Sequence, residues 1–374
     1  MFIPASSGGR VRLVRRVHGG DMTPRRIALV TESFYPAVDG TTTTLKNVAD
    51  HLIDTGHDVL LVAPGPGLTS YRSMPVVRIA PPRRGRQVRD ALAGFGPDLV
   101  HVTSPGALGR RALDHAGRLG LPTLLVQHSP MSHVPGPADR LVVTSRWMAD
   151  RMAALGVDAS VWQPGVDTAA FAPSLRDDWL HQKWARSKSA PGPRVVVGYA
   201  GSLHKRHGVR RLAELAGMPD IRLVVIGDGP QRAWLQAHLP GAKFTGALET
   251  GELATALASL DVLVHPGTEE TCCHVHREAA ASGVPVVAPH AGGVVGLVRS
   301  LETGLTYDAG DPRALRRAVE SVAGDRQRRL LGERGRELAA TRDWADACAE
   351  LDAIYDELLR VPHFASVQYV GVTG

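Results

Sequence analysis

Cysteine is scarce in this sequence, which has Cys272, Cys273 and Cys348 among 374 residues. Three cysteines, two of them adjacent, give no framework of paired disulfides, so we expect a reducing compartment such as the cytoplasm. Long apolar runs are also missing, since no stretch approaches the roughly 18 residues that a membrane-spanning helix needs. The composition thus argues against both a disulfide-stabilised scaffold and a protein that crosses a bilayer.

Lysine is rare as well, and the excess of positive charge is small. The chain carries 43 Lys and Arg against 37 Asp and Glu, and lysine occurs at only five positions. A net charge of +6 is too weak to indicate nucleic-acid binding. It is compatible with a phosphorylated small-molecule partner and with peripheral association at the inner face of a membrane, and both stay open.

Segments typical of strands and helices alternate along most of the chain. Continuous apolar runs at 27–31, 59–63, 195–199 and 223–226 indicate buried parallel strands. The segment 43–55 and others between the runs have the spacing of amphipathic helices, and this alternation predicts βαβ units. We therefore expect an α/β protein with two Rossmann-like domains, with the chemistry in a cleft at the carboxyl ends of the strands.

The pattern breaks once inside the chain. Residues 168–193 are polar and proline-bearing, which predicts an irregular linker. We place the N-terminal domain at 22–167 and the C-terminal domain at 194–340. Residues 1–21 lack the apolar core of a signal peptide, and we expect 1–21 and 361–374 to be disordered tails.

Two carboxylates eight residues apart mark the most informative segment. Glu270 follows the predicted strand 261–264, and Glu278 lies about one turn into the next predicted helix. The backbone N–H groups of 271–274 would then form a helix N-terminus, which attracts anions. Ionised carboxylates beside such a site are strong acceptors for sugar and ribose hydroxyls. Taken alone, the same residues also fit an ordinary helix with acidic residues in its first turns.

The neighbouring cysteines and histidines at 272–276 raise the question of a metal. Side chains of adjacent helical residues diverge, and no second cluster in the sequence completes a tetrahedral site. We therefore predict no metal ion and no cofactor.

The segment 270–278 resembles the Glu-x7-Glu motif of the retaining glycosyltransferases of family 4, which have the GT-B fold. Other motifs of that family occur here in the same order and span nearly the whole chain: 32–40, 198–203, 226–230, 244–246, 281–285 and 291–293. Within the family the chain is similar to actinobacterial GDP-mannose-dependent α-mannosyltransferases that act on lipid-linked acceptors. The resemblance implies that a C-terminal helix at about 341–360 returns to pack on the first domain.

The resemblance also implies roles for individual residues. Glu270 would contact donor-sugar hydroxyls, Glu278 the ribose, and His128 would lie beside the donor sugar as an active-site histidine. The implied reaction retains anomeric configuration, with the leaving diphosphate drawing the acceptor proton. The predicted donor-binding residues, apart from Glu278, are Asp39, Gly40, Ser202, Lys205, Arg206, His207, Thr271, Cys272 and Cys273.

Two departures from the family pattern keep alternatives open. Ser202 and His207 stand where relatives carry an Arg and a Lys for the diphosphate, which leaves Lys205 and Arg206 as the full-time cations of that loop. The segment 130–139 is too short for the usual acceptor-side helix. The acceptor is thus a lipid, a glycan or a small molecule such as a natural-product aglycone or aminocyclitol glycosylated from a UDP- or GDP-sugar. A catalytically weak pseudo-glycosyltransferase is the remaining alternative.

Overall fold

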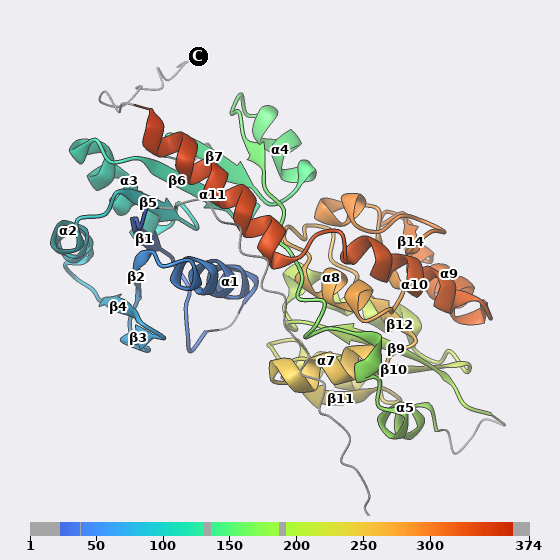
Figure 1. The fold of residues 1–374 in the computed structure, drawn as a ribbon. Helices are drawn as coiled ribbons and strands as arrows, with labels where there is room; N and C mark the ends of the chain where they lie inside the picture. The colour runs from blue at the N-terminus through green and yellow to red at the C-terminus, as the bar shows by residue number, and fades with distance from the viewer. Residues whose placement is uncertain (1–22, 38, 131–135, 187–191, 362–374) are drawn as a thin grey trace, which may run out of the picture.

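The computed structural model describes residues 23–37, 39–130, 136–186 and 192–361 (Figure 1). The tail predicted at 1–21 lies outside the described residues, as does that at 361–374 except for Val361. No helix in these described ranges is long and apolar enough to cross a membrane.

The first half of the chain forms an eight-stranded sheet in the order β3-β4-β2-β1-β5-β6-β7-β8. All neighbours are parallel except β3 and β4. Successive residues of β1 enter different cores: Ile27 and Leu29 pack on one face of the sheet, Ala28 and Val30 on the other. The strands are β1 (Arg26–Val30), β2 (Asp58–Pro64), β3 (Ser70–Tyr71), β4 (Met74–Ile79), β5 (Leu99–Val102), β6 (Thr123–Gln127), β7 (Arg140–Val143) and β8 (Ser160–Val161), and the helices are α1 (Gly40–Asp54), α2 (Arg84–Phe95), α3 (Ala107–Leu119) and α4 (Arg146–Ala153).

The second half forms a six-stranded parallel sheet in the order β11-β10-β9-β12-β13-β14. Its central strand β9 is buried on both faces, which explains its continuous apolar run. The strands are β9 (Val195–Ala200), β10 (Ile221–Ile226), β11 (Lys243–Gly246), β12 (Val262–Val264), β13 (Val286–Pro289) and β14 (Gly304–Tyr307). The helices are α6 (Arg232–His238), α7 (Thr250–Ala258), α8 (His274–Ala281), α9 (Ala314–Gly324) and α10 (Arg328–Ala339), with 3-10 turns η2 (Lys205–His207), η3 (Val209–Leu215) and η4 (Gly292–Gly296).

The segment 168–193 is more regular than the sequence predicts. It contains a 3-10 turn, η1 (Pro173–Leu175), and a helix, α5 (Asp178–Ala185), which packs against β9 and β10. Asp177 caps α5 by accepting a hydrogen bond from Leu180 N, and Trp184 is buried. The prediction of an irregular linker is therefore wrong for 173–185. A helix of two turns is too short for its periodicity to stand out, and tertiary contacts stabilise it.

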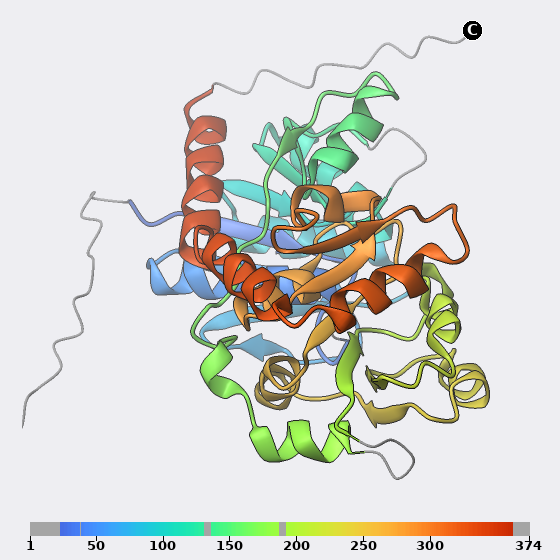
Figure 2. The same ribbon diagram turned by 90° about the vertical axis from the view of Figure 1, so that its right-hand side faces the viewer.

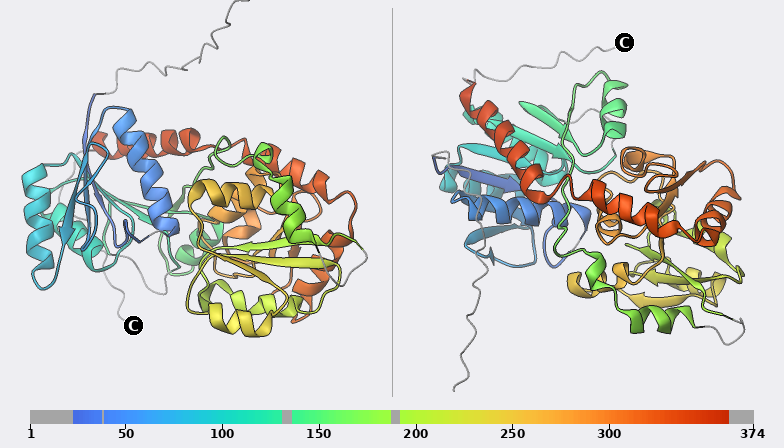
Figure 3. Two further views of the ribbon diagram at one scale, coloured as in Figure 1. Left: turned by 90° about the horizontal axis from the view of Figure 1, so that it is seen from below. Right: turned by 45° about the vertical axis from the view of Figure 1, so that its right-hand side comes forward.

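The last helix, α11 (Trp344–Arg360), returns to the first sheet. Figures 1 and 3 show it running from the second sheet's side of the molecule across the first, next to α1. Its backbone accepts a hydrogen bond from Trp162 Nε1 at Ala347 O, 2.7 Å away, and the Tyr355 hydroxyl lies 2.7 Å from His101 Nδ1. The chain crosses between the two sheets twice, once outward through Val166 and once back through Asp343. The two crossings lie side by side, because Val166 forms a parallel bridge with Asp343. The C-terminal helix thus completes the core of the first sheet.

Replacing Tyr355 by phenylalanine should lower the free energy of unfolding by about 1–2 kcal/mol, because it removes a buried hydrogen bond. Burial lowers the pKa of His101 to about 3, so the ring is neutral and loses its only partner at Nδ1. Tyr307 supplies the control, because its buried hydroxyl has no hydrogen-bond partner among the described residues. Urea unfolding should show no loss in the free energy of unfolding for Tyr307→Phe. Equal losses in the Tyr355→Phe and Tyr307→Phe proteins would show that the hydrogen bond to His101 does not stabilise the fold.

Candidate active site

Two loops from different sheets meet at the carboxyl ends of their strands. His128 directly follows β6, and the loop carrying Glu270 to Cys273 follows β12. Thr271 Oγ1 donates a hydrogen bond of 2.6 Å to the backbone carbonyl of His128, whose Nδ1 lies 3.4 Å from Cys272 Sγ. Figure 2 shows the second sheet in front of the first in this region. The fold thus brings His128 of the first sheet into contact with Thr271 and Cys272 of the second, as predicted site residues.

His128 is held there as a neutral ring. It is 5% exposed, and burial lowers its pKa to about 3. Burial also raises the pKa of Cys272, which keeps that side chain a thiol. Nε2 of His128 has no hydrogen-bond partner among the described residues. A neutral imidazole with one unengaged nitrogen can hydrogen-bond a ligand hydroxyl, but it does not supply a charge.

Glu270 is ionised and already has a partner. Burial alone would raise its pKa, but His265 and His207 beside it bring the pKa down to about 2. His207 Nδ1 lies 2.7 Å from Glu270 Oε1, and Arg206 Nε donates a hydrogen bond of 3.1 Å to His207 Nε2. Because Nε2 accepts, the ring proton belongs on Nδ1, where it is donated to Glu270. His207 therefore donates from Nδ1 to the carboxylate and orients it.

One group within the described ranges has the composition of a metal site. The potential ligand atoms of His207, His265 and Glu270 all lie within 4.8 Å of one another. Two imidazoles and a carboxylate suit Zn²⁺ in other proteins. Here His265 Nδ1 accepts a hydrogen bond from Gly267 N at 3.4 Å, which places the ring proton on Nε2. Binding a metal through Nε2 would require the opposite tautomer, so His265 is arranged as a hydrogen-bonding ring.

The anion-binding amides belong to a loop and not to the helix itself. We expected 271–274 to form a helix N-terminus, but α8 begins at His274, after Cys273 at φ 53° and ψ 40°. A left-handed residue interrupts the helical hydrogen-bond pattern, which the side chain of cysteine does not signal in the sequence. The amides of Thr271, Cys272 and Cys273 donate to no partner among the described residues. Three such amides beside Glu270 remain available to an anion.

Glu278 lies one turn into α8, as predicted, and is half-buried. Its carboxylate forms no hydrogen bond or ion pair with any described residue, and only its backbone carbonyl is engaged, accepting from Ser282 N at 2.9 Å. Burial raises its pKa to about 7. Glu270 and Glu278 therefore differ near neutral pH, because only the first is fully ionised.

Asp39 and Gly40 lie at the start of α1. Asp39 is the N-cap, with its carboxylate accepting a hydrogen bond from Thr42 N at 2.8 Å. Nε2 of His274 lies 3.0 Å from both Gly40 O and Thr44 Oγ1, which ties α8 to α1. A Cβ on Gly40 would lie 3.3 Å from His274 Cδ2, so this contact leaves little room for a side chain.

Comparisons with known proteins show the family of the chain. The family model described as "Glycosyltransferase Family 4" matches residues 38–170, and "Glycosyl transferases group 1" matches 181–338. The sequence is 37% identical to the GDP-mannose-dependent alpha-mannosyltransferase of Mycolicibacterium smegmatis, over 89% of this chain and 98% of that protein. The protein of that name in Corynebacterium glutamicum is 32% identical, over 93% of this chain and 92% of its own length. The chain belongs to the family 4 glycosyltransferases. The alternative of a pseudo-glycosyltransferase finds no support in these relatives.

Solved structures confirm the predicted GT-B fold of this glycosyltransferase. HepE of Anabaena in complex with UDP-glucose superposes with a TM-score of 0.76 at 19% identity, covering 89% of this chain and 100% of that one. Sucrose-phosphate synthase of Thermosynechococcus elongatus gives a TM-score of 0.75 at 20% identity, covering 89% and 99%. At such identities the likeness concerns the fold alone.

The two cationic side chains that we expect at the donor, Lys205 and Arg206, lie on the loop after β9. Lys205 and Arg206 are exposed, and neither forms an ion pair with a described residue. Ser202 is also exposed, and its carbonyl accepts a hydrogen bond of 3.0 Å from the Tyr199 hydroxyl. His207, expected at the diphosphate, instead contacts the carboxylate of Glu270. The two remaining cations therefore are not committed to carboxylates of the protein.

The sequence analysis assigned no role to three histidines around this site. His274 ties α8 to α1, His265 stacks on Tyr199 with ring centroids 5.2 Å apart, and His276 packs 4.7 Å from His265. Burial lowers the pKa of His276 to about 3, so it too is neutral. Their only sequence signal is density, since three of the 16 histidines fall within 265–276.

Proposed function

We propose that this glycosyltransferase transfers mannose from GDP-mannose to a lipid-linked or glycan acceptor with retention of configuration. The observation that carries the proposal is the row of three unbonded amides, Thr271 to Cys273, flanked by the carboxylates of Glu270 and Glu278. Relatives at 32–38% identity named as GDP-mannose-dependent alpha-mannosyltransferases support the choice of donor.

We assign a part of the donor to each group. The free amides and the cations Lys205 and Arg206 hold the diphosphate, and Glu270 accepts hydrogen bonds from sugar hydroxyls. Glu278 accepts from the ribose. The bond between the anomeric carbon and the diphosphate oxygen breaks, the acceptor oxygen bonds to that carbon on the same face, and the leaving diphosphate takes the acceptor proton. Preorganised amides and cations stabilise the charge on the leaving group, so we propose that no metal ion is required.

A soluble acceptor is the second candidate. The acceptor side offers only the short segment 130–139, of which 131–135 lie outside the described residues. The 2-deoxystreptamine N-acetyl-D-glucosaminyltransferase of Streptomyces fradiae is 28% identical over 79% of this chain and 85% of its own. An aminocyclitol or natural-product acceptor therefore remains the alternative to a lipid.

We also propose a cytoplasmic enzyme that associates peripherally with the inner face of the membrane when its acceptor is a lipid. Three unpaired, buried cysteines support a reducing compartment, and the charge of +6 supports attraction to an anionic surface.

Incubating the purified protein with GDP-mannose, UDP-glucose and UDP-N-acetylglucosamine, with and without EDTA, tests the proposal. Release of GDP from GDP-mannose, undiminished by EDTA and stimulated by an acceptor extract, is the expected result. Turnover of a UDP-sugar alone would overturn the choice of donor. Loss of turnover in EDTA, restored by a divalent cation, would overturn metal independence.

Replacing Arg206 by alanine should weaken GDP-mannose binding about 10- to 100-fold, because a charge-assisted phosphate contact is lost. Arg206→Lys should recover part of the affinity, since the charge stays while the two-pronged geometry is lost. Isothermal titration calorimetry measures both, with the exposed Lys243→Ala as a control of equal charge change. Parent-like affinity in Arg206→Ala would assign the diphosphate to other groups.

GDP-mannose binding should tighten about tenfold between pH 6 and pH 8. The pKa of Glu278 is near 7 in the free protein, and ribose hydroxyls donate better to its carboxylate than to its acid form. Binding therefore lowers this pKa and releases a proton, so affinity is weaker below pH 7 and levels off above it. Titrations across this range should lose the dependence in Glu278→Gln and keep it in Glu333→Gln, an exposed control. An unchanged pH profile in Glu278→Gln would refute the assignment.

A further inference from the structure

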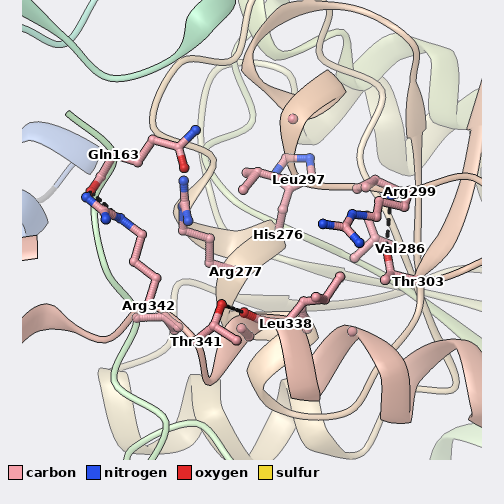
Figure 4. A pocket seen from close by; sticks show the side chains of 16 residues that line it. Gln163, His276, Arg277, Val286, Leu297, Arg299, Thr303, Leu338, Thr341 and Arg342 are labelled. Carbon is pink, nitrogen blue, oxygen red and sulfur yellow. Dashed lines mark hydrogen bonds between the residues drawn. The ribbon is translucent and has the colours of Figure 1, made fainter. Parts of the chain in front are cut away.

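A cavity of about 240 Å³ lies behind the donor site, where the two chain crossings meet (Figure 4). Its walls come from α8, η4 and α10, from Gln163 on the outgoing crossing, and from Thr341 and Arg342 on the returning one. None of the predicted donor-binding residues lines it. The cavity therefore has its own lining but adjoins the donor site, because His276 lines the cavity and packs against His265 of that site.

The lining is basic without any acidic partner. Three arginines, Arg277, Arg299 and Arg342, contribute to the wall, and no aspartate or glutamate does. Arg342 and Arg299 pair with carboxylates outside the lining, at Glu350 and Glu302. The cavity thus combines three guanidinium groups with no negative charge of its own.

Arg277 is the exception among these three, because it is buried and unpaired. It is 9% exposed and forms no ion pair with any described residue. Its one side-chain hydrogen bond among the described residues runs from Nε to Cys272 O, a long 3.4 Å, and leaves both terminal nitrogens without a partner there. Figure 4 shows the guanidinium extending toward the side-chain amide of Gln163. A buried charge without a counter-ion is unfavourable, and a guanidinium cannot escape by losing its proton.

Other polar side chains of the cavity lining also lack hydrogen-bond partners among the described residues. Both ring nitrogens of His276 are buried without a hydrogen-bond partner in the described part of the chain. The side-chain amide of Gln163 also forms no hydrogen bond within it. Leu297 and Leu338 add an apolar wall. The cavity therefore offers cationic and neutral donors at one side and an apolar surface for a small organic group.

We propose that this cavity binds a phosphate group, either as inorganic phosphate or as the monoester of a small metabolite. A phosphate matches the fork of the guanidinium with two parallel hydrogen bonds, supplies the missing counter-charge and accepts from the amide of Gln163. Because Gln163 on one crossing and Thr341 and Arg342 on the other line the cavity, the ligand lies between the two connections of the sheets.

Calorimetric titration of the whole protein with inorganic phosphate and with glucose 6-phosphate, at constant ionic strength and in saturating GDP, tests the site. Binding should persist in GDP, and Arg277→Gln should weaken it at least about tenfold. Arg206→Ala, in the donor loop, and Arg329→Gln, on the surface of α10, should bind phosphate like the parent. Equal affinities for inorganic phosphate and glucose 6-phosphate assign the site to free phosphate. Tighter binding of glucose 6-phosphate assigns it to a phosphomonoester.

Hydrogen exchange on the parent protein locates the site without a variant. Added phosphate should protect backbone amides at both crossings, 163–166 and 341–343. Protection confined to 201–207 or 270–274 would place the phosphate in the donor cleft and overturn the proposal. No binding of either ligand at 10 mM, or parent-like binding by a folded Arg277→Gln protein, would overturn it too.

Discussion

Replacing Glu270 by glutamine should reduce kcat/KM for mannosyl transfer about 100- to 1,000-fold. The carboxylate is ionised, since its pKa is about 2, and His207 holds one oxygen at 2.7 Å. A carboxylate accepts from two sugar hydroxyls, whereas an amide offers one acceptor oxygen and presents a donor where the second is needed. Losing charge-assisted hydrogen bonds of about 1.5–3 kcal/mol each accounts for this size.

Glu269→Gln is the matched control, because Glu269 is the exposed neighbour of Glu270 and the substitution changes charge equally. Initial rates over a range of donor concentrations, with circular dichroism to show that each variant folds, make the comparison. If Glu270→Gln keeps more than about a third of the parent's kcat/KM, the carboxylate does not contact the reacting sugar.

Replacing Gly227 by alanine should lower the free energy of unfolding by more than about 3 kcal/mol, or prevent folding. Gly227 has φ +132°, and a Cβ there would lie 2.0 Å from the carbonyl oxygen of Gly201. Its amide donates a hydrogen bond of 2.8 Å to Gly246 O, so the backbone cannot move aside without breaking the end of the sheet. The strained backbone conformation and the clash with rigid backbone therefore both lower the stability of the Gly227→Ala protein.

Gly241→Ala is the matched control, because a Cβ there meets nothing within 4 Å and the backbone is not left-handed. Urea unfolding compares the two soluble variants, and the yield of soluble protein compares them if Gly227→Ala does not fold. A loss below about 1 kcal/mol for Gly227→Ala would show that the turn relaxes at little energetic expense.

His207 stands where the resemblance to the family implies a lysine, and the two side chains differ in the hydrogen bonds that they can form. A ring that donates from Nδ1 and accepts from Arg206 links the loop of the two cations to the carboxylate of Glu270. A lysine there could donate to Glu270 but could not accept from Arg206. The phosphate contacts that we propose for this loop therefore rest on Lys205 and Arg206, while His207 contacts both Arg206 and Glu270.

The sequence by itself determined the fold class and the identity of the donor-site motif. Apolar runs such as 27–31 and 195–199 are strands because a segment buried on both faces of a parallel sheet excludes polar residues. Glu270 and Glu278 are recognisable because their spacing places one at a strand end and one a turn into the next helix. These are local properties, and local patterns survive in a one-dimensional sequence.

Tertiary structure alone decided how the groups are paired and charged. The contacts of His274 with Gly40, of His128 with Cys272 and of Tyr355 with His101 join residues 144 to 254 positions apart. The opposite pKa shifts of Glu270 and Glu278 depend on burial and on which histidines surround each carboxylate. The unpaired charge of Arg277 is equally invisible in the sequence, because a counter-ion is a neighbour in space and not along the chain.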